Sequence, residues 1–259
     1  MSLCLLNNVK KSNIFIKPFP HVVIENALDW NIYNELVCSL NLLDIKNQME
    51  PLDGYEIRYK YSKFKNQICL PNIWDEFLQY HSSTEFVNKV INIFGNKIKE
   101  IDKKFYKKFK TEDVFLRDHE PAWINKHSLP YSHSSDSQIV IHNPLNDTET
   151  TRTPHIDSPK ELYAGLLYMK QDEDISTGGD LELYSAYAPG DFLKKDGKLR
   201  EACLDKIEKE KVIKYKKNNF IIFLNTKDAI HGVSPRIKSK LNRLSVNVIL
   251  EKTNGKYKI

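Results

Sequence analysis

The part of the chain after residue 137 is a succession of short apolar segments. Turn-forming stretches such as NPLNDTE and APGDF separate them. Runs of this length, rich in β-branched and aromatic residues and bounded by turn residues, are typical of β-strands. The segments are QIVIH (138–142), ELYAGLLYM (161–169), GDLELYS (179–185), NFIIFL (219–224) and NRLSVNVIL (242–250). Short strands with few helices between them predict an antiparallel barrel or jelly roll.

The first half of the chain has mainly helical patterns. FPHVVIENALDWNIYNELVCSL predicts a strand over 21–24 and then a helix, because the apolar residues after Trp30 recur at helical spacing. In SSTEFVNKVINIFG, Ser82 and Glu85 predict a capping box, and Gly95 predicts the end of that helix. Between residues 51 and 70 the pattern leaves the presence of strands open.

No change in composition divides the 259 residues. We therefore expect one domain over 1–259, of class α+β, with a helical N-terminal part over about 1–130 and a jelly-roll core over about 131–252. The charged stretch 191–211 reads as an insertion that is partly helical. Hydrophobic residues make up 41% of the chain, enough for a folded core, while 28% are charged, which favours a water-exposed surface.

The sequence predicts a cytoplasmic protein without disulfides. The start, MSLCLLNNVKKS, has its lysines after the apolar run, the reverse of a signal peptide, and no stretch has the ~20 apolar residues of a membrane span. Cys4, Cys38, Cys69 and Cys203 are scattered and form no C-x-x-C pair. The oligomeric state is left open.

The densest basic run is KKFYKKFK, Lys103 to Lys110. Lysines interleaved with aromatic residues are compatible with a nucleic-acid surface. The same spacing also fits an amphipathic helix that buries Phe105 and Phe109 on one side. Because the net charge is only +5, we favour the helix.

The stretch TPHID contains a candidate metal site. If it is extended, His155 and Asp157 point to the same side, because side chains alternate along a strand. Two further histidines, His142 and His231, lie near ends of predicted strands. We favour His231 as the third ligand, because Gly232 beside it leaves room for close backbone approach.

The last predicted strand alternates cleanly between polar and aliphatic residues. Arg243, Ser245 and Asn247 share one face, and aliphatic residues share the other. Periodicity alone does not say which face points inward. If the polar face does, Arg243 forms an anion site inside the protein, since its planar guanidinium can hold a carboxylate by two hydrogen bonds.

Two imidazoles and one carboxylate make up the facial triad of non-haem Fe(II) oxygenases. The chain resembles the 2-oxoglutarate/Fe(II)-dependent dioxygenases, nearest the prolyl-4-hydroxylase-like branch. The resemblance covers roughly residues 18–43 and 138–251 and lies in FPHVVIENAL, RTPHID, LYAGLLYM, GGDLELY and NTKDAIHGVSPR…NRLSVNVILE. It implies a double-stranded β-helix, that is, a distorted jelly roll.

The same resemblance implies iron on His155, Asp157 and His231, and 2-oxoglutarate on Arg243 and Ser245. O2 would be the co-reactant and ascorbate a reductant. The reaction would couple decarboxylation of 2-oxoglutarate to succinate and CO2 with hydroxylation of a C–H bond. The expected substrate is a small molecule or a protein side chain, and its identity cannot be predicted from the sequence.

The sequence leaves a second arginine as an alternative anchor. Arg236 follows His231 by five residues, whereas Arg243 follows it by twelve, further than is usual in the family. We favour Arg243 because it lies in an alternating strand with Ser245 two residues on. Animal prolyl 4-hydroxylases have a lysine at the anchor, so their substrate is not assumed.

Two related chemistries are disfavoured. Halogenases of the superfamily lack the carboxylate ligand, whereas Asp157 is present. Nucleic-acid demethylases of this fold carry a second arginine further along the anchor strand, where this chain has Ile249. Nucleic acid is therefore not the expected substrate, and no membrane partner is expected.

Several further residues could contribute to the site. Arg152, Tyr168 and Tyr184 could face the pocket, although packing or surface roles are favoured for them. Asn225 and Thr226 could orient a ligand. An alternative from another class is a jelly-roll metal protein without redox chemistry, either a binding module or a zinc enzyme with the same three ligands.

Overall fold

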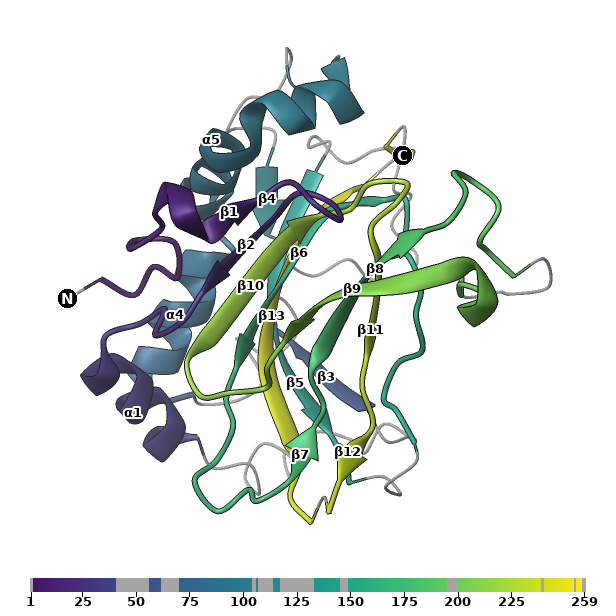
Figure 1. Ribbon diagram of the computed structural model, residues 1–259. Coiled ribbons are helices and arrows are strands. Elements are labelled where there is room, and N and C mark those ends of the chain that lie inside the picture. Colours follow the sequence, from purple (N-terminus) through teal and green to yellow (C-terminus); the bar gives the residue numbers. More distant parts are fainter. Residues whose placement is uncertain are drawn as a thin grey trace, which may run out of the picture.

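A large antiparallel sheet forms the centre of the computed structural model (Figure 1), which describes residues 2–40, 56–61, 70–103, 106, 114–116, 133–144, 149–194, 200–238, 240–253 and 255–257. The strand order of this sheet is β1 (Ile14–Phe15), β2 (His21–Ile24), β10 (Asn219–Leu224), β6 (Glu161–Tyr168), β13 (Arg243–Lys252), β5 (His133–His142) and β3 (Glu56–Lys60). β4 (Val114–Leu116) pairs with β5 in parallel.

A smaller sheet lies against one face of the large one. It has the order β11 (Ile230–Val233), β8 (Leu181–Ala186), β9 (Ile207–Ile213), and β12 (Arg236–Ile237) pairs with β7 (Thr177–Gly178) nearby. An apolar layer separates the sheets and includes Leu181 and Leu183 from β8 and Ile221 and Phe223 from β10. The predicted double-stranded β-helix is confirmed.

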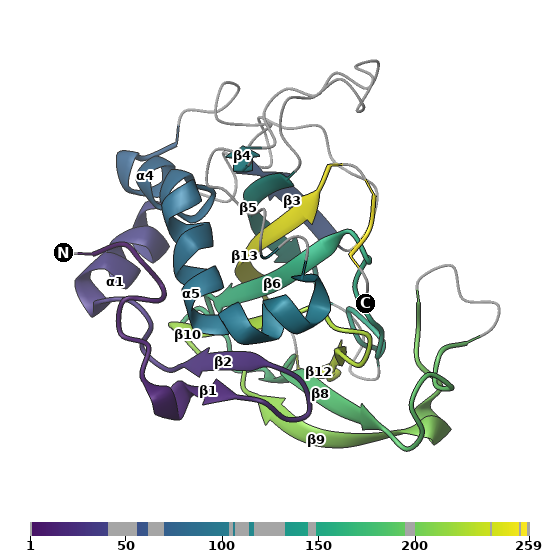
Figure 2. The same cartoon turned by 90° about the horizontal axis from the view of Figure 1, so that it is seen from above.

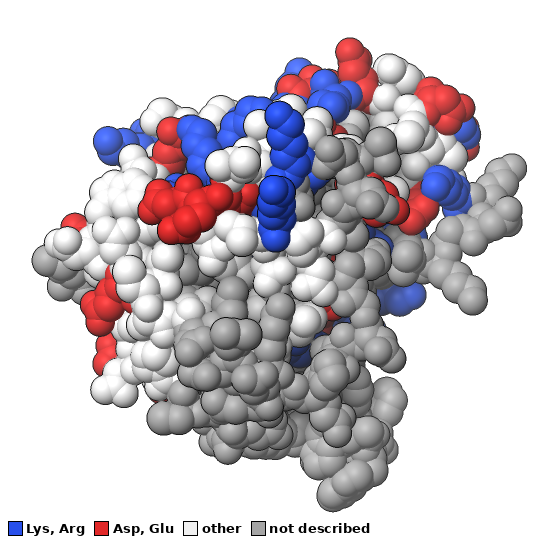
Figure 3. Space-filling view, turned by 90° about the horizontal axis from the view of Figure 1, so that it is seen from below, with Lys and Arg blue, Asp and Glu red and all other residues white. Residues whose placement is uncertain are grey.

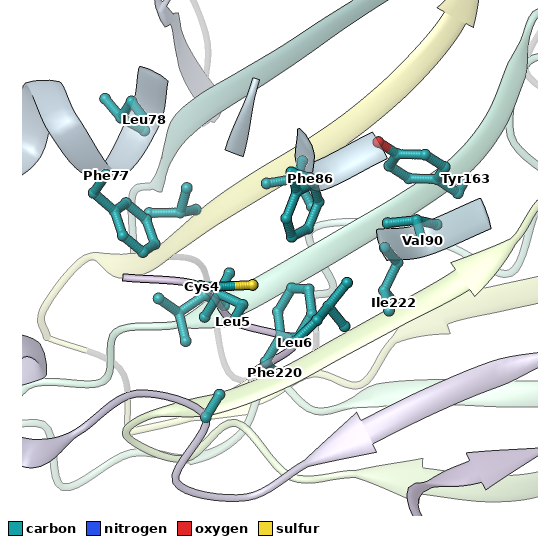
Figure 4. Close-up of a cluster of buried hydrophobic side chains, with 14 of the residues drawn as sticks. Cys4, Leu5, Leu6, Phe77, Leu78, Phe86, Val90, Tyr163, Phe220 and Ile222 are labelled. Carbon is teal, nitrogen blue, oxygen red and sulfur yellow. The ribbon is translucent and has the colours of Figure 1, made fainter. Parts of the chain in front are cut away.

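Helices cover the opposite face of the large sheet (Figure 2). They are α1 (Trp30–Ser39), α4 (Asn72–His81) and α5 (Thr84–Ile101), and single 3-10 turns occur at Lys11–Asn13 and Leu204–Lys206. Figure 4 shows Phe77, Phe86 and Val90 from these helices in the same buried apolar cluster as Phe220 and Ile222 of β10. The α+β class with N-terminal supporting helices is thus confirmed.

The strand β13 shows which of its faces is inward. Leu244, Val246, Val248 and Leu250 belong to the apolar core that contains the helices. The alternate residues Arg243, Ser245, Asn247 and Ile249 line a cavity between the two sheets. The polar face therefore points into the molecule, which is the condition for an internal anion site.

The second predicted helix differs from expectation at both ends. Ser83, not Ser82, caps α5, because the Ser83 hydroxyl accepts a hydrogen bond from the Phe86 N–H, whereas Ser82 lies at the end of α4. The helix also continues through Gly95 to Ile101. Glycine costs about 1 kcal/mol in a helix, and burial of Ile98 on the far side of it outweighs that cost.

The prediction of a partly helical insertion over 191–211 is wrong for its last residues. Ile207–Ile213 is the strand β9, paired with β8. It is an edge strand whose central residues are largely exposed, which explains its charged sequence. Residues 195–199 lie outside the described part, as does most of 103–110, so the helix expected there stays a prediction.

The cysteines that the structure describes, Cys4, Cys38 and Cys203, are free thiols, and Cys69 lies outside the described residues. Among the described helices, none has both the length and the apolar character that crossing a membrane requires.

Candidate metal centre

His155, Asp157 and His231 lie together at the cavity between the sheets. Their potential ligand atoms are all within 4.8 Å of one another. The Asp157 carboxylate is central, with Oδ1 3.4 Å from His155 Nε2 and Oδ2 3.5 Å from His231 Nε2. In the described part of the chain, this is the group of histidine and acidic side chains that could hold a metal ion.

The main chain brings the two histidines together. His155 forms isolated antiparallel bridges with His231 and with Glu201, so the extended segment expected at TPHID is reduced to these bridges. The bridge with His231 needs close approach, because a Cβ on Gly232 would lie 3.0 Å from the backbone nitrogen of Pro154. The room that the sequence suggested beside His231 is therefore occupied by the segment that carries His155.

Both imidazoles have their Nδ1 atoms engaged. His155 Nδ1 donates to the Thr153 carbonyl at 2.8 Å, and His231 Nδ1 donates to the Ala229 carbonyl at 2.9 Å. A metal-binding histidine commonly makes such a bond with its other ring nitrogen, which fixes the tautomer. Both Nε2 atoms are thereby left to face Asp157.

Burial and local charge set the protonation of this group. Burial lowers the pKa of His231 to about 4, although Asp157 opposes the shift. For Asp157, burial favours the neutral acid, but the nearby His231, His155 and Arg58 outweigh it and hold its pKa below the usual range. A neutral imidazole beside a carboxylate is the donor set that divalent transition metals bind.

The cavity has a volume of about 830 Å³. The triad lies on its wall together with Phe223 of β10 and the polar face of β13. Clefts of this size are typical of sites for small molecules. The cavity can therefore hold a ligand of the metal and a second compound.

Arg243 presents an uncommitted hydrogen-bond donor to this cavity. Its side chain is 1% exposed, and Nε donates to the Gly179 carbonyl at 3.0 Å. The guanidinium carbon lies 5.0 Å from the Tyr168 ring centroid and 4.9 Å from that of Tyr215. Nη2 is buried and has no hydrogen-bond partner among the described residues. A buried donor of this kind is costly, and a bound carboxylate would satisfy it.

Ser245 also lines the cavity and is buried beside this arginine on β13. Its hydroxyl donates to Asn247 Oδ1 at 3.1 Å. The hydroxyl lies on the polar face of β13, and rotation about its C–O bond would redirect the hydrogen to a ligand.

Arg236, the alternative anchor, already makes three hydrogen bonds away from the cavity. Its Nη2 donates to Asp174 Oδ2 at 2.8 Å and to the Leu241 carbonyl at 2.7 Å, and its Nε donates to Ser176 Oγ at 2.8 Å. It does not line the cavity. The geometry therefore favours Arg243 as the group that can bind an anion.

Of the other residues named in the sequence analysis, some line the cavity and some do not. Arg152, for which a packing or surface role is expected from the sequence, lines the cavity, whereas the Tyr184 hydroxyl donates to Glu182 Oε2 at 2.5 Å and Tyr184 is not part of the cavity wall. His142 lines the cavity away from the triad, with Nε2 3.1 Å from Glu56 Oε2. Asn225 binds the carbonyls of Ser158 and Glu161 rather than a candidate ligand.

Gly178 and Gly179 form a tight turn beside the cavity residue Arg243. Each has a positive φ, +80° and +68°. A Cβ on Gly178 would lie 2.0 Å from the Pro235 carbonyl oxygen, so the chain approaches closely as well as turning.

Sequence reasoning missed Arg58, Glu56 and Arg200, which all line the cavity. Glu56 and Arg58 lie on β3. The alternation of charged residues with Ile57 and Tyr59 in EIRYK was a signal for that strand. The sequence around Arg200 has no comparable alternating pattern.

Comparison with known proteins gives a family for the second half of the chain. Residues 139–251 match the model of the 2OG-Fe(II) oxygenase superfamily. No curated protein matches. Structural similarity to solved proteins is at TM-scores just below 0.5.

One similar structure is a prolyl 4-hydroxylase from Phytophthora capsici, 15% identical, covering 90% of this chain and 58% of that one, with a TM-score of 0.49. The chain thus spans less than two thirds of that protein. A prolyl-4-hydroxylase from Pseudomonas putida is 11% identical over 91% and 93% of the two chains, at 0.47. The epimerase SnoN, in complex with Fe3+ and alpha-ketoglutarate, is 7% identical over 89% and 78%, at 0.48.

The matched residues contain His155, Asp157, His231 and Arg243. The resemblance suggested by the sequence is therefore confirmed for residues 139–251, which match the 2OG-Fe(II) oxygenase superfamily.

Proposed function

We propose that this protein hydroxylates a C–H bond of its substrate, coupled to decarboxylation of 2-oxoglutarate to succinate and CO2. His155, Asp157 and His231 would hold Fe(II), and Arg243 with Ser245 would bind 2-oxoglutarate. The observation that carries the proposal is the pairing, in one cavity, of three converging ligands with a buried arginine that has a free donor.

The three proposed ligands would leave part of the coordination sphere of the iron free. Three protein ligands on one side of a metal leave positions for a chelating cosubstrate and O2. When bound, iron and 2-oxoglutarate would supply the oxidising chemistry. The carbonyls of Thr153 and Ala229 hold the two imidazoles, and this fixes the direction of both Nε2 atoms.

Arg243 is suited to the distal carboxylate of 2-oxoglutarate. Its guanidinium lies against the rings of both Tyr168 and Tyr215, and burial raises the pKa of Tyr168 to about 12, so that ring stays neutral. A guanidinium binds a carboxylate by two hydrogen bonds, which are stronger where water is excluded. Ser245 would add a third bond from the same strand.

Hydroxylation is preferred to halogenation because the carboxylate ligand is present. Asp157 lies between the two imidazole Nε2 atoms, at 3.4 and 3.5 Å. It would occupy the coordination position that a halide needs.

The test is turnover of the cosubstrate. Anaerobically purified protein is supplied with Fe(II), ascorbate and 2-oxoglutarate labelled at C1, air is admitted, and released CO2 and bound iron are measured. We expect CO2 release by the wild type and by Asp191→Ala, whose carboxylate is a surface group paired with Lys206. Asp157→Ala should lose both iron and turnover.

Iron content that is unchanged in Asp157→Ala would refute the ligand assignment. Protein that binds zinc but neither iron nor 2-oxoglutarate would instead support a zinc enzyme. Ascorbate is expected to prolong turnover, and its omission in a parallel reaction tests that role.

A further inference from the structure

We propose that the oxidised substrate is a small anion whose carboxylate or phosphate group is bound by Arg152 at the cavity. This rests on the proposed function, since it concerns the second compound in the same cavity. The starting observation is an excess of positive charge. The cationic residues of the wall are Arg58, Arg152, Lys160, Arg200, Arg243 and Lys256, against three acids, Glu56, Asp157 and Glu161.

The proposed cofactors do not remove this excess. Fe(II) brings two positive charges and 2-oxoglutarate two negative charges, so together they leave the balance as it is. Arg243 and Asp157 are assigned to these two. The remaining wall is therefore still cationic, and a cavity lined by one sign of charge concentrates ligands of the opposite sign.

Three arginines lie within electrostatic reach of the triad from three separate segments. Arg58 of β3 is among the groups that lower the pKa of Asp157, and Asp157 in turn favours the charged form of Arg200, whose pKa burial lowers. Arg152 contributes to the lowered pKa of His231. These three positive charges therefore act on the triad and also line the cavity.

Of these arginines, Arg152 is the one left uncommitted. Arg58 pairs with Glu56, and Arg200 donates to the backbone carbonyl of Asp157. The Arg152 side chain makes no hydrogen bond or ion pair within the part of the chain that is described; it acts on Glu201 only through its charge, and Glu201 pairs with Lys194. Its backbone is nevertheless fixed, because its carbonyl accepts from the Val233 N–H at 2.9 Å.

The charge excess of the cavity wall contrasts with the mixed charges on one face of the molecule. On the face shown in Figure 3, positive and negative side chains are intermingled. The volume of about 830 Å³ leaves room for 2-oxoglutarate and one small compound. An anionic metabolite fits both the size and the charge.

The test uses four probes with one aromatic ring each: phenyl phosphate, benzoate, neutral benzamide and cationic benzylamine. Protein is loaded with Mn(II) and 2-oxoglutarate, and Mn(II) binding is first measured by electron paramagnetic resonance. Line broadening of the probe protons by the bound Mn(II) then reports binding near the triad. Phenyl phosphate and benzoate separate the two sources of negative charge.

We expect broadening by either anion to exceed that of benzamide and benzylamine. Arg152→Ala should weaken anion binding by about tenfold or more, and Arg152→Lys less, because it keeps the charge but loses the planar fork. The control Lys216→Ala removes a surface charge paired with Glu25 and should bind as wild type does.

Equal binding of all four probes, or equal loss in Arg152→Ala and Lys216→Ala, would overturn the inference. Either result leaves the proposed function intact, because Mn(II) binding has been shown beforehand. Failure of the protein to bind Mn(II) would contradict the proposed function instead, and the two failures are thus distinguished.

Discussion

His155 and His231 exchange two backbone hydrogen bonds, from His155 N to His231 O at 2.9 Å and from His231 N to His155 O at 3.0 Å. The separation of the two proposed ligands is therefore set by the main chain. Ligands that are carried by hydrogen-bonded backbone segments are held more precisely than ligands on loops. The bridge depends on Gly232, against which Pro154 packs.

Gly232→Ala should lower metal affinity by about 10- to 100-fold, the usual effect of disturbing the support of metal ligands. The added Cβ would lie 3.0 and 3.1 Å from the backbone N and Cα of Pro154, and backbone atoms cannot easily move away. Titration with Mn(II) measures the affinity. Gly95→Ala is the control, because its new Cβ meets the movable ring of Tyr106. Equal affinity in both variants would contradict the role of the bridge.

Arg243→Ala should raise the KM for 2-oxoglutarate by about 100-fold, because it removes charge-assisted hydrogen bonds to the distal carboxylate. Arg236→Ala should act on stability instead, since it leaves Asp174 buried without its ion-pair partner, a loss of about 3–5 kcal/mol. Steady-state kinetics and urea unfolding separate the effects. The reverse pattern would move the anchor to Arg236.

The candidate site was predictable from the sequence because its residues lie in short, regular patterns. Alternation in NRLSVNVIL places Arg243 and Ser245 on one face, and H-x-D does the same for His155 and Asp157. What periodicity cannot supply is the choice of inward face. That choice depends on the helices, which bury Leu244 and Val246 against their own apolar sides.

The parts that escaped prediction are strands with polar sequences. β9 reads as a charged insertion because it is an edge strand, paired only with β8. β5 begins at His133, five residues before the apolar run, and Ser134, Asp136 and Ser137 are buried there. Their strand conformation is set by pairing with β13, a long-range contact that local propensity does not contain.

Asn225→Ala should lower both stability and, more weakly, metal affinity. The Asn225 amide donates to the carbonyls of Ser158 and Glu161 at 2.7 and 3.1 Å, which holds the turn that follows Asp157. Losing these two partly buried hydrogen bonds costs about 1–3 kcal/mol, measurable by urea unfolding. Thr226→Ala, one residue on, is the matched control. Unchanged unfolding in Asn225→Ala would show that the turn holds without this tether.

His81 joins the N-terminal segment to the helical layer. Its Nδ1 donates to the Phe77 carbonyl at 2.7 Å, and its Nε2 accepts from the Leu5 N–H at 3.2 Å. In Figure 4, Leu5 lies in the buried apolar cluster with Cys4 and Leu6. Because Nε2 is an acceptor, protonation of His81 would break the contact with Leu5.

Acid should therefore destabilise the fold through His81. Burial lowers its pKa to about 3 from 6.5, so the unfolded chain binds a proton more readily than the folded one below pH 6.5. The contribution is complete above pH 6.5 and is lost progressively as pH falls towards 3, by about 2 kcal/mol at pH 5. His81→Gln keeps a donor and an acceptor but does not titrate. Urea unfolding at pH 7 and pH 5 should show the wild type losing about 2 kcal/mol more than His81→Gln, and an equal loss would exclude His81 as the acid-sensitive group.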